Sequence, residues 1–200
     1  MKRELPYFEI NHSFGGNQNW FFDPWMRIGG CGALTMCDLM IYMAAFHQKP
    51  ECYPYDIANL SKKDYRRFGM LMKPYLRPRE TGIKDLPTFI EGAEYFLQYS
   101  EIEGISFEAF DGHRPLDDAK AAVIRSIDAG LPVPMLMLNH TDPKFDFFEW
   151  HWFLIVGYEQ TAGKLNIKTA TYGKARWLDF DAFWETGHEE RGGLVLVSCE

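Results

Sequence analysis

The sequence predicts one α+β domain, in which a helical N-terminal half packs against a C-terminal antiparallel sheet. Helical spacing of apolar residues dominates up to about residue 130, and strand-like runs dominate after it. The 200 residues are 46% hydrophobic and 16% aromatic, which is enough for one sizeable core, and no internal repeat or low-complexity stretch marks a second domain. We therefore expect residues 1–200 to form a single domain.

The N-terminal half is expected to contain a loop followed by a buried helix. Residues 11–30 are rich in glycine, asparagine and aromatic side chains, which indicates an irregular loop. From Cys31 to Ala45 apolar residues occupy every side of the predicted helix, which is typical of a helix buried in the middle of a domain. Weaker helical patterns follow at 55–68 and 83–99.

The C-terminal half is expected to be a sheet with two further helices. Pro115 opens a helix that should run through Ile127 and stop at Gly130, and a short helix is expected near 181–184. Strands are expected at 105–110, 133–138, 151–158, 165–171, 176–178 and 194–198.

Charge and composition exclude several functions. The net charge is -7, and the basic residues are scattered except for one short run, so nucleic acid is not an expected partner. That run, which is typical of a solvated helix face, consists of Lys62, Lys63, Arg66 and Arg67. The histidines have no ligand spacing with the cysteines or with one another, so we expect no metal and no cofactor.

Neither a leader nor a membrane span is expected. The segment Met1–Ile10 lacks the apolar stretch of a signal peptide, and no window reaches the length of a membrane span. The four cysteines have neither paired-ligand spacing nor the density of a disulfide scaffold. The sequence therefore predicts a cytoplasmic protein with at least one cysteine free to react.

Cys31 is the candidate nucleophile because it begins the buried helix. The positive end of a helix dipole stabilises a thiolate, and a nearby imidazolium stabilises it further. Gly30 and Gly32 leave the backbone accessible to a substrate carbonyl, and the Cys31 N–H can donate to an oxyanion. The alternative is that Cys31 is a small buried hydrophobic residue at the start of a core helix.

His151 is the candidate base. It lies between Trp150 and Trp152 at the start of the most hydrophobic predicted strand, so its imidazole should lie at the edge of the core. A lone histidine at such a place is often a hydrogen-bonded structural residue. Together with a helix-terminal cysteine, it indicates acyl transfer through a thioester.

Three segments of the chain resemble the papain-like cysteine peptidase superfamily. They are Gly30-Cys31-Gly32-Ala33, Ala129-Gly130-Leu131-Pro132-Val133 and His151-Trp152-Phe153-Leu154-Ile155-Val156-Gly157-Tyr158. Their order and lengths are most similar to the bacteriocin-processing double-glycine peptidases and also resemble the butirosin-type acyltransferases. The resemblance covers most of the chain from about Gln18 onwards. It implies a papain-like fold, a Cys31 nucleophile, a His151 base and an upstream glutamine that helps to hold the oxyanion.

Gln18 is the candidate for that glutamine, with Asn17 and Asn19 as neighbours that can substitute for it. It precedes Cys31 by 13 residues, which is farther than the family usually places its glutamine, so the loop would have to fold back. The alternative is that this polar stretch is only a turn.

The third catalytic residue departs from the family pattern. The resemblance implies Asp or Asn on the strand after the histidine, to orient the imidazole, but the segment 167–173 has threonines there. Thr169 matches the position best, and Asp179 can supply a charge from another direction. A hydroxyl can accept a hydrogen bond from the imidazole N–H, although it does not stabilise the imidazolium as a carboxylate does.

A second feature near the histidine is a stretch of alternating acidic and aromatic residues. Asp142, Asp146 and Glu149 alternate with four aromatic side chains between 145 and 150, which can make an acidic rim for a cationic substrate. The alternative is a loop whose aromatic side chains pack down on the sheet.

Three functions remain open at this point. The first is peptide or amide hydrolysis through a Cys31 thioester, with a peptide or a small-molecule amide or acyl compound as substrate. The second is an acyltransferase of the same fold, which a large apolar tunnel beside Cys31 would favour. The third is a catalytically silent binding domain, which an occluded Cys31 would favour.

Overall fold

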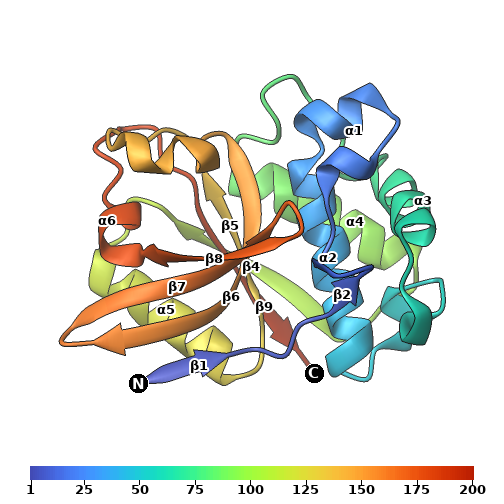
Figure 1. Ribbon diagram of the computed structural model, residues 1–200, viewed down its shortest axis with the longest axis horizontal. Coiled ribbons are helices and arrows are strands. Elements are labelled where there is room, and N and C mark those ends of the chain that lie inside the picture. The colour runs from blue at the N-terminus through green and yellow to red at the C-terminus, as the bar shows by residue number, and fades with distance from the viewer.

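The computed structural model describes residues 1–200 and has an α+β fold, which confirms the class that the sequence predicts (Figure 1). The α-helices are α1 (Pro24–Gly29), α2 (Cys31–Phe46), α3 (Lys62–Met72), α4 (Leu86–Tyr99), α5 (Leu116–Asp128) and α6 (Phe180–Trp184). Short 3-10 helices are η1 (Gln18–Trp20), η2 (Pro50–Cys52), η3 (Ile57–Asn59) and η4 (Pro143–Phe148). Helices α1 to α4 lie on one side of the molecule, and the sheet with α5 and α6 lies on the other.

The main sheet is antiparallel, with strand order β4-β9-β5-β6-β7-β8. Its strands are β4 (Ile105–Asp111), β5 (Val133–Met137), β6 (His151–Thr161), β7 (Lys164–Thr171), β8 (Lys174–Asp179) and β9 (Gly193–Cys199). The N-terminal strand β1 (Lys2–Glu4) also pairs with β6. A separate hairpin consists of β2 (Glu9–Ile10) and β3 (Ser13–Phe14).

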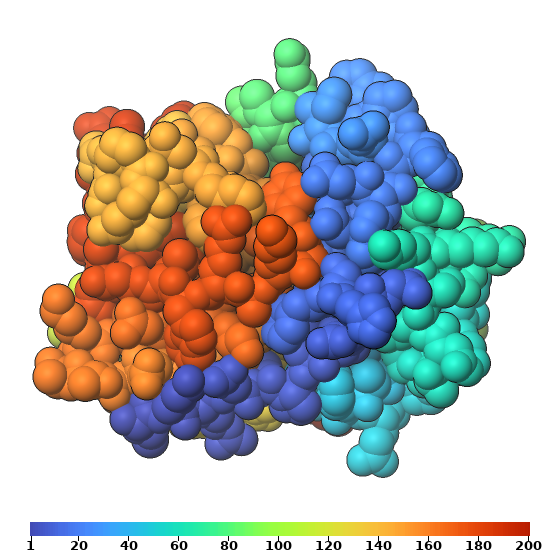
Figure 2. Space-filling view, viewed as in Figure 1, coloured from blue at the N-terminus to red at the C-terminus, as the bar shows by residue number.

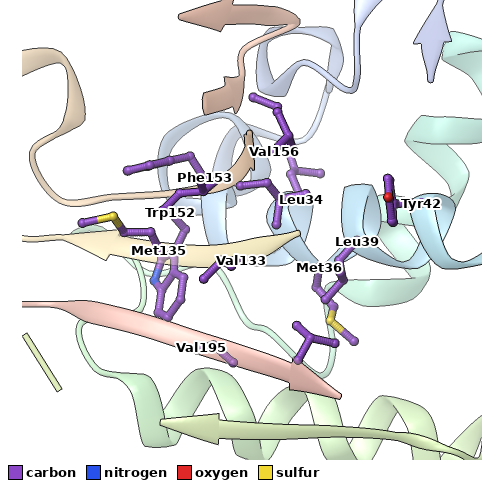
Figure 3. Packing of buried hydrophobic residues seen from close by; sticks show 14 of the residues in the cluster. Leu34, Met36, Leu39, Tyr42, Val133, Met135, Trp152, Phe153, Val156 and Val195 are labelled. Carbon is purple, nitrogen blue, oxygen red and sulfur yellow. The ribbon is translucent and has the colours of Figure 1, made fainter. Parts of the chain in front are cut away.

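Helix α2 lies in the middle of the molecule, with α1 and α3 against it on the helical side and β5 and β6 of the sheet on the other (Figure 1). Every residue from Cys31 to Met43 is buried, as the uniformly apolar sequence predicts. Figure 3 shows Leu34 and Met36 of this helix among core residues that include Val133 of β5 and Trp152 of β6. The helix therefore holds its first residue, Cys31, at a fixed place against the sheet.

Strand β6 is covered on both faces. Trp152 stacks on Phe89 of α4 at 4.1 Å between ring centroids, whereas Phe153 contacts Phe183 of α6 at 5.8 Å. The Trp152 indole also donates to the Ile83 carbonyl at 2.8 Å. A strand that is buried on both faces has a continuous apolar sequence, which explains the residues that follow His151.

One carboxylate is buried in the middle of α2. Asp38 accepts hydrogen bonds from the hydroxyls of Tyr65 and Tyr7 at 2.7 and 3.1 Å, and from the Gly16 N–H at 3.2 Å. A Cβ at Gly16 would overlap the Tyr65 ring, so only glycine fits there. Burial raises the pKa of Asp38 to about 6, and these three donors counteract that rise. The contacts fasten the chain before α2 onto the helix.

The structure differs from the sequence expectation mainly before Cys31. The composition of residues 11–30 predicts an irregular loop, yet this segment contains η1 and α1. Helix α1 begins at Pro24, where the Asp23 side chain accepts from the Met26 N–H at 2.9 Å. Asp followed by Pro is a helix-start signal, but a six-residue helix is too short to show apolar periodicity.

Two further findings concern membranes and metals. None of the helices combines the length and hydrophobicity that crossing a bilayer requires. No group of three or more His, Cys, Asp or Glu side chains is arranged to hold a metal ion.

We predict that truncation in α2 destabilises the fold far more than truncation on the surface. Leu39→Ala removes a side chain that is 0% exposed, so it should lower the free energy of unfolding by about 2–5 kcal/mol. Leu71→Ala on α3, where the side chain is 51% exposed, is the matched control and should change it by no more than about 0.5 kcal/mol. Urea denaturation measures both. Equal effects would contradict the central position of α2.

Candidate active site

Cys31 lies at the start of α2, and Gly30, which ends α1, is its N-cap. No side chain caps this helix. The polar groups that act on the thiol are backbone N–H groups. Burial raises the pKa of the Cys31 thiol, and the N–H groups of Trp152, Gly32 and Cys31 itself counteract that rise. The residue is 5% exposed, so the resting thiol is protonated and covered.

A tight turn lies close to the thiol. The Gly82 N–H donates to the Arg79 carbonyl at 2.9 Å, and Gly82 has a φ of +68°, which favours glycine. A Cβ at Gly82 would lie 3.5 Å from the Cys31 Sγ, which is ordinary van der Waals contact, so this turn approaches the sulfur closely. The turn at 79–82 is therefore a near neighbour of Cys31.

His151 is the first residue of β6, opposite Met137 of β5. Its Nε2 lies 2.8 Å from the Thr171 Oγ1, at the end of β7. The Tyr172 ring stacks on the imidazole, with 5.0 Å between centroids and 14° between planes. His151 is 5% exposed, and burial lowers its pKa to about 4. The Thr171 hydroxyl is thus hydrogen-bonded to Nε2, and the other ring nitrogen, Nδ1, stays available to a reaction partner.

Cys31 and His151 line one narrow pocket of about 20 Å³. Gln18, Thr171 and Tyr172 line it too. A volume of this size holds about one water molecule. The structure therefore brings the predicted nucleophile and base to the same small space, although the two residues are 120 positions apart in the sequence.

The electrostatics of this pocket favour a neutral pair. Burial raises the pKa of the thiol and lowers that of the imidazole, so both groups are uncharged near neutral pH in the closed structure. The resting state is thus a thiol and an imidazole rather than a thiolate and an imidazolium. An imidazole in this form can accept the thiol proton as a general base during attack.

Gln18 lines the same pocket as Cys31. The segment before α2 folds back through η1 and α1, so Gln18 is buried in the Cys31 pocket despite its distance in the sequence. Its Nε2 donates to the Arg27 carbonyl at 2.9 Å, which leaves the second amide hydrogen free to donate. Asn17 and Asn19 do not line this pocket; Asn17 instead donates to the Tyr172 carbonyl at 2.9 Å.

Thr169 and Asp179 occupy other places than the predicted third position. Thr169 lies opposite Ile155, well along β6 from His151, and its hydroxyl donates to the Arg176 carbonyl at 3.2 Å. Asp179 is at the far end of β8, where its carboxylate accepts from the Ala182 N–H at 3.1 Å and caps α6. Strand register is the reason, because only the end of β7 reaches the start of β6.

Thr171 is the residue that the sequence reasoning missed. It shares the face of β7 with Thr169 but lies two residues farther along, beside the imidazole. The missed signal is the dipeptide Tyr172-Gly173, which forms a two-residue turn between Thr171 and Lys174. Both turn residues have positive φ, +49° and +71°, as a hairpin of the I′ type requires.

Two bulky residues beside His151 have a left-handed backbone. Tyr172 has a φ of +49°, and Trp150 has a φ of +53°. Such conformations cost about 1–3 kcal/mol each in residues other than glycine and tend to cluster at functional sites. Five other non-glycine residues of the chain also have a positive φ, but these two lie beside His151, one stacked on its ring and one next to it in the chain.

The acidic and aromatic stretch before His151 forms η4 and packs down on the sheet. Phe145 and Phe148 are buried, and Glu149 accepts from the His140 N–H at 2.8 Å. Phe147 remains exposed, with the Arg176 guanidinium 4.0 Å from its ring centroid. The aromatic part of this stretch therefore packs on the sheet and holds a cation, Arg176, at the surface.

The chain matches no model of a known protein family, no curated protein and no solved structure. The geometry of the site is therefore the basis on which its chemistry is interpreted.

We predict that His151 stays neutral until the pH falls close to 4, because burial disfavours its charged form. An NMR titration of the ring protons should give a midpoint at about 4, with His151→Gln used to assign the resonance. A midpoint at or above the ordinary value of 6.5 would show that the imidazole is solvated or ion-paired.

We also predict that Thr171, and not Thr169, orients the imidazole. Thr171→Val removes the hydroxyl beside Nε2 and should slow alkylation of Cys31 by chloroacetamide about fivefold, the equivalent of about 1 kcal/mol. Thr169→Val is the matched control and should leave the rate unchanged, since that hydroxyl bonds Arg176. Peptide mapping by mass spectrometry gives both rates. The reverse order would restore Thr169 to the third position.

Proposed function

We propose that the protein is a papain-like cysteine-dependent acyl-transfer enzyme that hydrolyses a peptide or another amide through a Cys31 thioester. The observation that carries the proposal is the shared pocket, which is lined both by a cysteine at a helix N-terminus and by a histidine whose Nε2 lies beside the Thr171 hydroxyl. A nucleophile, a base and an orienting group are the parts that such catalysis needs.

In the first half of the proposed reaction, the Cys31 sulfur attacks the amide carbon while His151 Nδ1 takes the thiol proton. The carbonyl oxygen becomes an oxyanion, with the Cys31 N–H and the free amide hydrogen of Gln18 as its donors. When the tetrahedral intermediate collapses, the imidazolium returns the proton to the leaving amine, and the acyl group stays on Cys31 as a thioester.

In the second half, His151 takes a proton from water, and the resulting hydroxide attacks the thioester carbon. The carbon–sulfur bond then breaks, the acid leaves, and the proton returns to the sulfur. Thr171 fixes the ring through both halves, but its hydroxyl carries no charge to stabilise the imidazolium. We therefore expect slower turnover than a carboxylate-assisted triad would give.

The proposed reaction needs the site to open. Cys31 is 5% exposed and its pocket holds about one water molecule, so the walls of the pocket have to move before a substrate carbonyl reaches the sulfur. Opening also admits water, which weakens the burial that raises the thiol pKa and lowers the imidazole pKa. Opening of the pocket thus both admits the substrate and eases proton transfer.

The surroundings of Cys31 also bear on the two alternatives, an acyltransferase and a catalytically silent binding domain. The pocket of about 20 Å³ is far smaller than the apolar tunnel that would favour an acyltransferase for long acyl groups. The occlusion of Cys31 is the specific observation that favours a catalytically silent binding domain. The silent domain is therefore the second candidate.

The test is the formation of a covalent adduct on Cys31. Incubation with a panel of peptide amides and acyl thioesters, followed by intact-mass measurement, should show an acyl-enzyme for at least one donor. Cys31→Ala should abolish the adduct, whereas Cys199→Ala, which changes a free cysteine outside the site, should retain it.

Each outcome of this test selects one function. An adduct that forms from peptide amides and clears in water indicates a hydrolase. An adduct from acyl thioesters that persists until an amine is added indicates an acyltransferase. Absence of any adduct, with Cys31 still unreactive toward chloroacetamide, would replace the enzyme with the silent binding domain.

A further inference from the structure

A second cavity, of about 340 Å³, adjoins the Cys31 pocket. Thr171 and Tyr172 line both spaces, so they form the wall between them. We call this outer cavity the vestibule. Its volume lies within the usual range for small-molecule sites, whereas the inner pocket holds about one water molecule. A substrate that reaches Cys31 past the imidazole would thus leave part of itself in the vestibule.

The charged residues of the vestibule are both cations. Lys174 and Arg176 alternate on β8 and so lie on one face of this edge strand. Neither takes part in an ion pair, and no acidic side chain lines the cavity. In a chain of net charge -7, two unpaired cations beside a candidate active site form a local positive field.

The other walls hold these groups in place and add neutral donors. The Arg176 guanidinium lies over the Phe147 ring at 4.0 Å, which restricts its position. Asn17 and Asn19 line a further wall, and Asn17 is tied to the Tyr172 carbonyl at 2.9 Å. Figure 2 shows where the orange surface of the β7–β8 hairpin meets the blue N-terminal segment that carries these amides.

We propose that the vestibule binds a carboxylate of the substrate, so that the enzyme acts on amides or peptides that carry an acidic group close to the reacting carbonyl. A planar guanidinium matches a carboxylate, and lysine and asparagine add further donors. This inference rests on the proposed function of Cys31. It also reverses the cationic substrate that the acidic residues before His151 suggest from the sequence.

The experiment compares charged and neutral reagents of the same shape. The probes are N-(2-carboxyethyl)chloroacetamide and N-(4-carboxybutyl)chloroacetamide, each paired with the reagent in which a carboxamide replaces the carboxylate. In every reaction the Cys31 sulfur displaces chloride, and the thiol proton passes to His151. At least one acid should alkylate Cys31 about tenfold faster than its amide partner, since it gains charge-assisted hydrogen bonds.

Variants locate the source of that preference. Arg176→Gln and Lys174→Gln should each reduce the ratio of acid to amide rates, and Lys164→Gln, at the far end of β7, is the matched control that should not. Raising the salt concentration from about 0.05 to 0.5 M should also reduce the ratio, because salt screens exposed charges. Equal rates for acid and amide with both linker lengths would overturn the inference while leaving the proposed function intact.

A binding measurement decides the inference if Cys31 reacts with none of the four reagents, an outcome that would contradict the proposed function. Calorimetry with Cys31→Ala protein then compares 5-acetamidopentanoate with its primary amide, neither of which reacts. Binding of the acid alone, lost in Arg176→Gln, supports the carboxylate site. Equal binding of acid and amide, or no binding of either, overturns it.

Discussion

Burial of α2 on every side is the constraint on which the rest of the structure depends. A helix without a solvent-exposed face needs apolar neighbours all around it, and this chain supplies them from α3, from the sheet and from the segment that precedes the helix. The one carboxylate inside, Asp38, needs hydrogen-bond donors as well. These donors are the hydroxyls of Tyr7 and Tyr65 and the N–H of Gly16. Gln18 follows Gly16 by two residues and lines the Cys31 pocket. The position of the proposed oxyanion donor is thus linked to the hydrogen bonds that satisfy one buried charge.

Burial of two titratable groups, Asp38 in α2 and His151 in β6, sets two opposing pH dependences of stability. Asp38 has a folded pKa of about 6, above its ordinary 3.8, so the folded state binds more protons and its contribution to stability falls as the pH rises between these values. His151 has a folded pKa of about 4, below its ordinary 6.5, so its contribution is complete above 6.5 and is lost as the pH falls towards 4. Between about pH 4 and 6 the two slopes have opposite signs and partly cancel.

The helices and strands were largely predictable because their signals are local. Helix α2 and strand β6 are apolar on all sides, and α5 begins after Pro115 as expected. Cys31 and His151 could be selected in the same way, since each begins such an element. Strand β1 could not be predicted, because its three exposed residues owe their conformation to pairing with β6.

Strand register, rather than residue type, decides which side chain of β7 lies beside the His151 ring. Thr169 and Thr171 are alike in sequence, and only the pairing of β6 with β7 places one beside Ile155 and the other beside His151. The vestibule has the same origin, because its walls come from η1, η4 and β8, which are distant in the chain. Of the acidic residues before His151, Glu149 accepts from the His140 N–H and Asp142 pairs with Lys144, whereas Arg176 of β8 lies over Phe147 of the same stretch.

The left-handed backbone at Tyr172 has a consequence for the evolution of this chain. Asparagine or glycine would adopt that conformation at lower cost, and Asn-Gly is the preferred pair for such a turn. Selection for heat resistance alone should therefore favour asparagine or glycine in place of this tyrosine, and either replacement removes the ring that covers the imidazole. A tyrosine kept at this place in related chains would then be a record of selection for the site, and its replacement would mark lineages in which the site is no longer used.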